Sequence, residues 1–159
     1  MRIFAIDPGN EASAYALVEL PDFRILDKGK IQNDELLELC RSIKREEADL
    51  ASIEMIASYG MPVGREVFDT CVWIGKFLGA LNISATTVYR LEEKQCLCHD
   101  TRANDASIRR ALIDRYARHD LKTGRGTIKN PDVFHGVSAD IWAAIAVAVT
   151  TFEKILGGR

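Results

Sequence analysis

The chain has 159 residues, of which 47% are hydrophobic and 28% are charged, and its formal net charge is −2. This composition is typical of a globular protein, and the length fits a single domain over residues 1–159. No apolar run approaches the roughly 18 residues of a membrane span, and the first residues lack the basic and apolar regions of a signal peptide. We therefore expect a cytoplasmic protein without membrane association, in which the four cysteines stay reduced.

The first third of the chain predicts an antiparallel meander of three strands. Short apolar and alternating runs cover residues 2–7, 13–20 and 24–31. Tight turns are expected at Pro8–Gly9 and Pro21–Asp22, because proline and glycine end a strand and redirect the chain.

Helices and strands alternate in the rest of the chain. We expect a helix at 33–46, a strand at 50–56 and a helix at 64–81. A fifth strand at 86–90 is followed by a short helical turn and then by helices at 103–118 and 137–155. A meander followed by alternating elements predicts an α/β protein with a five-stranded mixed sheet and helices on both faces. The helix at 64–81 is apolar over a wide surface, so part of it is either core or a dimer interface.

Two of the strands carry a carboxylate at or near their C-terminal end. Asp7 ends the first strand, where a charge is unfavourable unless a partner such as a divalent cation binds it. Alternatively, Asp7 caps the turn that follows. In the strand at 50–56, period-two alternation puts Ser52 and Glu54 on one face. Ligands of α/β sheets bind at the carboxyl ends of strands, so both acids are candidate ligands for a metal ion.

A third carboxylate, Asp140, opens the last helix. Ser138 is a plausible N-cap, which places Asp140 in the first turn of an alanine-rich, largely buried helix. Acids are common in first turns, because they interact favourably with the helix dipole. Asp140 is unusual because almost no other charge follows it before Glu153.

Five segments, in their order along the chain, resemble RuvC-type Holliday junction resolvases. Three contain the acids: Ile6–Gly9, Ser52–Glu54 and Ser138–Val147. The segments Tyr59–Val67 and Arg102–Asp114 more narrowly resemble phage and prophage members of that group. The resemblance spans nearly the whole chain and implies the RNase H-like fold.

The resemblance also implies the chemistry. Asp7, Glu54 and Asp140 would bind two Mg²⁺ ions, for which Mn²⁺ can substitute, and no small-molecule cofactor is expected. The activity implied is hydrolysis of phosphodiester bonds in branched DNA by a homodimer, because a four-way junction needs two symmetric cuts. Lys94 resembles a basic residue that contacts the phosphate in this family.

The chain departs from the family pattern at one position. Resolvases usually carry two metal-binding side chains three residues apart at the last helix, whereas Val137 stands three residues before Asp140. Asp132 or His135 could supply the missing ligand, and Asp69 is a further candidate.

The basic residues are concentrated between the second and third acidic motifs. Residues 90–129 hold ten Lys or Arg and six Asp or Glu, whereas residues 1–60 carry a net charge of −5. Such an excess beside a metal site is either a nucleic-acid footprint or a solvated face. The candidate DNA contacts are Arg102, Arg125, Lys129 and, through base stacking, Tyr59.

Four other interpretations remain open from the residues alone. The same fold and acids occur in nucleases that act on RNA or on RNA–DNA hybrids. A junction-binding protein with an incomplete metal site would also fit Val137. Cys96 and Cys98, with His99, could bind zinc, but their spacing is poor for a structural site. A nucleotide-binding module of the sugar-kinase type shares Asp-Pro-Gly but needs a second phosphate loop and a longer chain.

Overall fold

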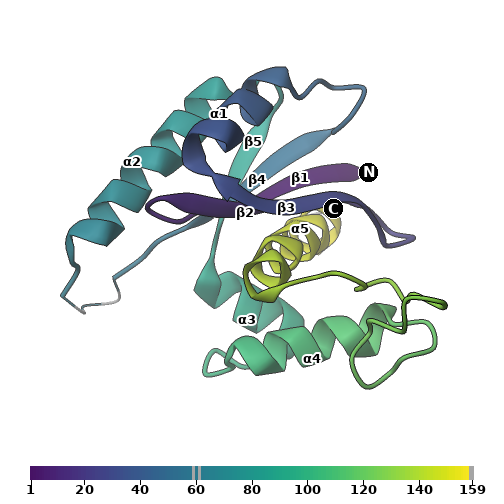
Figure 1. Cartoon of the computed structure of the whole chain (residues 1–159). Coiled ribbons are helices and arrows are strands. Elements are labelled where there is room, and N and C mark those ends of the chain that lie inside the picture. Colours follow the sequence, from purple (N-terminus) through teal and green to yellow (C-terminus); the bar gives the residue numbers. More distant parts are fainter. Residues whose placement is uncertain (59, 61, 158–159) are drawn as a thin grey trace.

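The computed structural model contains a five-stranded mixed sheet in the order β3-β2-β1-β4-β5 (Figure 1). The structure describes residues 1–58, 60 and 62–157. The first three strands form an antiparallel meander, and β4 and β5 run parallel to β1. The strands are β1 (Arg2–Asp7), β2 (Ala12–Glu19), β3 (Arg24–Gln32), β4 (Leu50–Met55) and β5 (Ala85–Tyr89). The expected fold class and the antiparallel first three strands are therefore confirmed.

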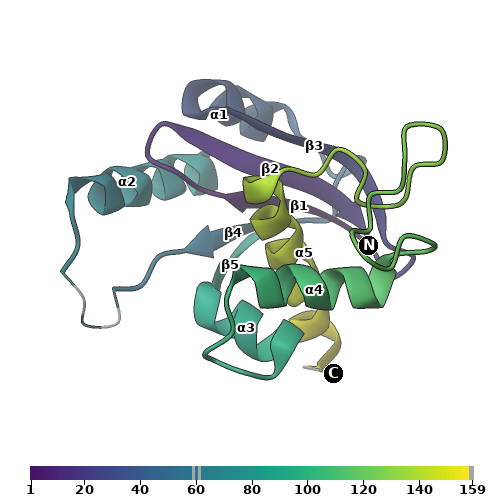
Figure 2. The ribbon, with the colours of Figure 1, turned by 60° about the horizontal axis from the view of Figure 1, so that its bottom comes forward.

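Helices cover both faces of this sheet (Figures 1 and 2). The helices are α1 (Asn33–Ser42), α2 (Arg65–Ala80), α3 (Arg90–Cys98), α4 (Asp105–Tyr116) and α5 (Ala139–Gly157). One face carries α1 and α2; on the other, α5 packs on the sheet and α3 and α4 pack around α5. Within the described residues, no helix has both the length and the apolar character that crossing a membrane would require.

Two helices differ from the expectation. The first ends at Ser42 rather than near residue 46, because Ile43 leaves the helix in an extended conformation and is buried at 5% exposure. The expected short turn after β5 is the nine-residue helix α3. Its N-terminus is stabilised by Glu92, whose Oε2 accepts a hydrogen bond of 2.7 Å from the Tyr89 N–H.

Strand β1 lies at the centre of the sheet and contributes to two hydrophobic cores. Ile3 and Ala5 point toward α5, and Phe4 and Ile6 point toward α1 and α2. All four are at most 1% exposed, and burying an Ile or Phe side chain stabilises the fold by about 1.5–3 kcal/mol. The next residue, Asp7, therefore sits at the end of the most constrained strand of the sheet.

The parallel pairing of β1 and β4 aligns two of the candidate acids. Ile6 pairs with Ile53, so Asp7 and Glu54 each follow a paired residue at the same edge of the sheet. The face predicted for Glu54 is also the one observed, because Ser52 Oγ lies 2.6 Å from Thr151 Oγ1 of α5. Asp7 and Glu54 consequently both leave the sheet toward the start of α5.

Candidate active site

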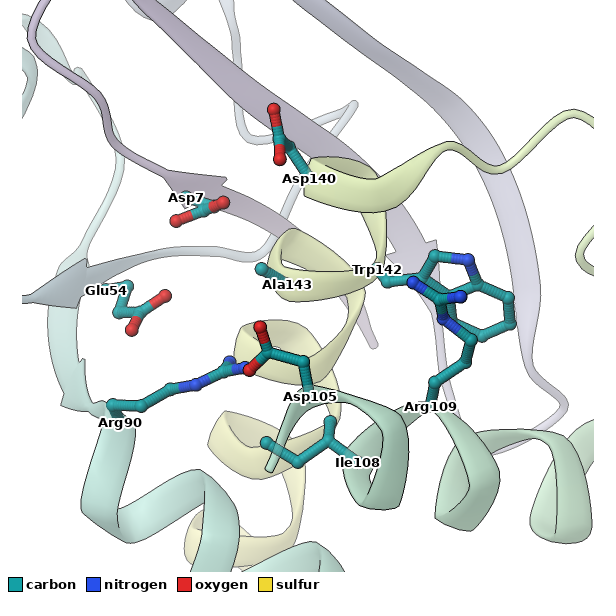
Figure 3. A pocket seen from close by; sticks show the side chains of 9 residues that line it. All are labelled: Asp7, Glu54, Arg90, Asp105, Ile108, Arg109, Asp140, Trp142 and Ala143. Carbon is teal, nitrogen blue, oxygen red and sulfur yellow. The ribbon is translucent and has the colours of Figure 1, made fainter. Parts of the chain in front are cut away.

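A cavity of about 280 Å³ opens where the carboxyl ends of β1 and β4 meet the first turns of α3, α4 and α5 (Figure 3). It contains four acidic side chains, two arginines and an apolar wall. The lining residues are Asp7, Glu54, Arg90, Asp105, Ile108, Arg109, Asp140, Trp142 and Ala143. The structure thus brings the three predicted acids, Asp7, Glu54 and Asp140, to one cavity, although 133 positions separate the first from the last.

The turn after Asp7 is fixed by a buried polar network. Ser13 Oγ accepts a hydrogen bond of 3.0 Å from the Gly9 N–H and donates one of 2.6 Å to Asn33 Oδ1. Asn33 Nδ2 donates in turn to the Gly9 carbonyl at 2.9 Å. A Cβ on Gly9 would lie 2.3 Å from the Ala12 carbonyl oxygen, so only glycine fits there. The alternative that Asp7 caps this turn is not needed, because Ser13 and Asn33 satisfy the turn.

Asp7 and Glu54 perturb each other strongly. Burial, the negative charge of Glu54, a shared hydrogen bond with Glu54 and the charge of Asp140 together raise the pKa of Asp7 to about 8. Burial also raises the pKa of Glu54, although the nearby Arg90 guanidinium opposes the rise. Two carboxyl groups in this position bind one proton between them, or a cation in its place.

Asp140 approaches the cavity from the first turn of α5 and forms an ion pair with Lys30 of β3. Hydrogen bonding to Asp140, together with the negative charges of Asp140 and Asp7, raises the pKa of Lys30. The side chains of Lys30 and Asp140 are 50% and 44% exposed, so both can rearrange. Figure 3 shows the Asp140 carboxylate on the opposite side of the cavity from Glu54.

Arg90 links the acidic cavity to a buried carboxyl group. Its guanidinium donates to Glu93 Oε2 at 2.5 Å and also pairs with Asp105. Glu93 is fully buried, and its Oε1 has no hydrogen-bond partner among the described residues. Burial and the charge of Glu54 raise the pKa of Glu93 to about 9. Arg90 is therefore held by two acids and adds a positive charge next to Glu54.

The donors of the cavity suit a hard divalent cation. Mg²⁺ prefers carboxylate oxygens, and the pKa of Asp7 stays raised although Arg90 lies near the pair, so a further positive charge would stabilise the two ionised acids. In the described part of the chain, however, no three His, Cys, Asp or Glu side chains are close enough together to hold an ion as they stand. Asp140, the third predicted acid, is instead paired with Lys30.

Neither position three residues from Asp140 carries a second acid. Val137 is 2% exposed and lies in the core, and Ala143, one turn after Asp140, forms the cavity wall. The acid that does line the cavity in addition to the predicted three is Asp105, from the first turn of α4.

Asp132 and His135 were the predicted substitutes, and the structure places neither in the cavity. The buried Asp132 carboxylate accepts hydrogen bonds from the backbone N–H groups of residues 118, 119, 120 and 133, at 2.7–3.1 Å. Although burial opposes it, these bonds lower the pKa of Asp132 well below its usual range. His135 is exposed, with Nδ1 3.1 Å from the Arg125 carbonyl. Asp69 also lies elsewhere, paired with Arg65 at 3.5 Å on α2.

The glycine-rich basic loop between α4 and α5 is tightly bonded. Asp120 accepts backbone hydrogen bonds from residues 122, 123, 125 and 126. Arg125 does not point freely into solvent, because its guanidinium donates to the Val137 carbonyl at 3.1 Å. Lys129 is exposed near the tip of a hairpin closed by Thr127 and Asn130. Lys129 forms no ion pair with any of the described residues, so of these two predicted contacts it is the one that presents an unengaged cation to the surface.

The other predicted DNA contacts lie away from the cavity or cannot be described. Lys94 is half-buried on α3 and does not line the cavity. The Arg102 side chain is 94% exposed and lies 3.8 Å from Asp100. Tyr59 lies outside the described residues.

Sequence patterns did not identify Lys30, Arg90, Asp105, Arg109 or Trp142 as site residues. Arg90 and Asp105 begin helices α3 and α4, and an acid or base at a helix start usually has only a local role. One sequence signal could have identified Arg109. It is adjacent to Arg110 on a predicted helix, and because adjacent helical residues point in different directions, the two arginines cannot both lie on the same face.

Two solved structures are similar to this chain over nearly its whole length. A structure of Thermus thermophilus RuvC matches with a TM-score of 0.71 and 15% identity, covering 99% of this chain and 97% of that chain. A structure of T. thermophilus RuvC in complex with Holliday junction substrate matches with a TM-score of 0.67 and 14% identity, covering 99% and 96%. Neither the models of protein families nor the curated protein sequences give a match. At this level of identity the likeness establishes the fold, and the chain has the RuvC-like form of the RNase H-like fold.

Proposed function

We propose that the protein is a metal-dependent endonuclease that cleaves branched DNA such as Holliday junctions. The observation that carries this proposal is the convergence of Asp7, Glu54 and Asp140 on one cavity of a RuvC-like fold. One of the similar structures holds Holliday junction substrate, which supports branched DNA as the partner here. The resemblance of Arg102–Asp114 to phage and prophage resolvases supports assigning the protein to that group.

Asp7 and Glu54 would hold Mg²⁺, with Asp140 as the third ligand once Lys30 releases it. When bound, the metal supplies Lewis-acid activation of a water molecule and of the scissile phosphate. The protein's own residues hold the acidic side chains in position. The Ser13–Asn33 network holds the turn after Asp7, and Arg90 fixes the charge beside Glu54. Lys30 keeps a positive charge near Asp140, where it can approach a DNA phosphate.

A homodimer would allow the two symmetric cuts that a four-way junction requires. The α2 helix supports this, because Phe68 and Val72 lie one turn apart and are 61% and 58% exposed. Large apolar side chains on one exposed helix face are typical of protein interfaces.

A second candidate is a junction-binding protein without efficient cleavage. It is favoured by Ala143 on the cavity wall, by the buried Val137, and by the ion pair that engages Asp140. This alternative retains the DNA-binding surface but lacks the ligand set that turnover needs.

The decisive experiment is cleavage of a mobile four-way junction, a matched linear duplex and an RNA–DNA hybrid at equal salt, in Mg²⁺ and in Mn²⁺. We expect metal-dependent cuts in the junction and little reaction with the duplex. The matched control is the Asp7→Asn variant, which should bind the junction without cutting it. Binding without turnover in either metal would favour the second candidate, and preference for the hybrid would refute the proposed substrate.

A further inference from the structure

We propose that Arg109 and Trp142 form a phosphate-binding subsite of the cavity, which holds the DNA strand beside the acidic residues. The inference rests on the proposed function and names a contact that the acids alone do not provide. Both residues line the same cavity as Asp7, Glu54 and Asp140. Figure 3 shows them at the end of the cavity away from Asp7 and Glu54, so the phosphate they would bind is a neighbour of the one that is cleaved.

Two buried N–H groups at this position lack acceptors. Neither the Nε of Arg109 nor the Nε1 of Trp142 has a hydrogen-bond partner within the described residues. Trp142 is only 4% exposed, so a phosphate reaches its N–H after a small shift of the neighbouring side chains, whereas Arg109 is half-buried and lines the cavity. A buried donor without a partner costs about 1–3 kcal/mol, which a ligand that supplies oxygen acceptors would recover.

The charge of Arg109 is available to an anion. The ion pairs found among the described residues engage Arg90 with Glu93 and Asp105, and Lys30 with Asp140, but leave Arg109 without an acidic partner. The neighbouring Arg110 pairs with Asp114 on the exposed side of α4. Arg109 is thus the arginine of the cavity wall whose guanidinium can bind an incoming phosphate through two parallel hydrogen bonds.

The two side chains of the subsite are already packed in place before any ligand binds. The Arg109 guanidinium carbon lies 5.4 Å from the centroid of the Trp142 ring, in a cation–π contact. Trp142 stacks on Phe134, with ring centroids 4.4 Å apart, and Phe134 is fully buried. The loop before α5 supports this stack, because a Cβ on Gly124 would lie 2.5 Å from the Phe134 ring. A preorganised arginine loses little further side-chain entropy on binding.

The ligand that fits this subsite is a phosphodiester group of a DNA strand rather than a small free carboxylate. Asp105 and Asp140 flank the subsite and disfavour small anions, which bring no other contacts. A DNA strand brings a row of phosphates, and its remaining contacts to basic residues offset this repulsion.

The test measures junction binding by fluorescence anisotropy, without Mg²⁺, over a range of salt concentrations. The variants are Arg109→Ala, Arg109→Lys and Trp142→Phe, with Arg110→Ala as the matched control that removes an adjacent arginine outside the cavity. We expect Arg109→Ala to weaken binding about 10- to 100-fold and to reduce the log–log salt slope by about one. Trp142→Phe, which keeps the ring and loses the N–H, should weaken it by a smaller factor, and Arg110→Ala should have little effect.

A junction series with single neutral methylphosphonates near the cut locates the contact. In the wild type, one substitution should weaken binding, and in Arg109→Ala the same substitution should have no further effect. Arg109→Lys keeps the charge, so it should retain the salt slope while losing most of the positional effect. It also replaces the alanine variant if that one fails to fold.

The outcomes separate this inference from the proposed function. If the wild type binds and cuts junctions but Arg109→Ala behaves like Arg110→Ala, the subsite is refuted and the nuclease assignment stands. If the wild type does not discriminate junction from duplex, the proposed function fails first. Equal sensitivity of wild type and Arg109→Ala to every methylphosphonate would likewise overturn the subsite.

Discussion

Replacing Asp7 by Asn should make the metal-free protein more stable at neutral and alkaline pH while abolishing cleavage. The carboxyl group of Asp7 is largely buried and lies near the negative charges of Glu54 and Asp140. Burial and these charges raise its pKa from 3.8 to about 8. Asparagine has the same shape, can still hydrogen bond to Glu54, and carries no charge. The substitution therefore removes the charge repulsion and leaves the packing of the turn intact.

The sign and size of the effect follow from this pKa. A group whose pKa is raised on folding makes its full contribution to the free energy of unfolding below its unfolded pKa, which is 3.8 here. That contribution is lost as the pH rises to about 8. Each pKa unit corresponds to about 1.4 kcal/mol, so the loss is at most about 6 kcal/mol. Asp7 keeps partial contact with solvent. We therefore expect a gain of about 2–4 kcal/mol for Asp7→Asn at pH 8.

The assay is thermal unfolding in a chelator at pH 3.5 and pH 8. For a chain of this length, the expected gain raises Tm by about 5–15 °C at pH 8 and by little at pH 3.5. Adding Mg²⁺ should raise the Tm of the wild type more than that of Asp7→Asn, because the variant has lost a ligand. Asp22→Asn, on the exposed turn before β3, is the control and should change the free energy of unfolding by less than about 0.5 kcal/mol. Equal Tm values for wild type and Asp7→Asn at pH 8 would refute the electrostatic argument.

Three further results are expected. Lys129→Glu should weaken junction binding and lower its log–log salt slope by about one, and an unchanged slope in a salt titration would show that the hairpin tip is merely solvated. Asp132→Ala should destabilise the protein by about 2–4 kcal/mol in urea unfolding, because several buried N–H groups lose their acceptor, while the Mg²⁺ concentration for half-maximal rate stays the same. A change in the Mg²⁺ concentration for half-maximal rate would show that Asp132 does act as a metal ligand. Glu93→Gln should raise Tm most at pH 9, because the pKa of Glu93 is raised from 4.5 to about 9 and its stabilising contribution is lost across that range. A lower Tm of that variant at pH 9 would mean that the ion pair with Arg90 dominates.

Local patterns in the sequence were enough to predict the sheet and two of its acids. A β-branched run followed by Pro8–Gly9 defines a central strand and its end, and it places Asp7 where the strand stops. Period-two alternation put Glu54 on the same face as Ser52, and the structure shows that this face is turned toward α5, where Ser52 contacts Thr151. These predictions hold because strand ends and the alternation of side chains between the two faces depend mainly on neighbouring residues.

Contacts between distant residues decided the rest of the site. Lys30 and Asp140, 110 positions apart, form an ion pair that no spacing rule predicts. Arg90 and Asp105 meet only because α3 and α4 pack against each other at one end of the cavity.

Asp132 shows the limit most clearly. In the sequence it is one more acid near the last helix and a possible substitute for the missing metal ligand. In the folded chain its carboxylate is fully buried and accepts hydrogen bonds from the loop's own backbone, while Asp140 faces the cavity. The sequence determines which groups can ligate a metal or pair with a charge. Which of them do so depends on the backbone donors and counter-charges that the tertiary structure places within a few ångströms of each one, since charge interactions and hydrogen bonds act over those distances.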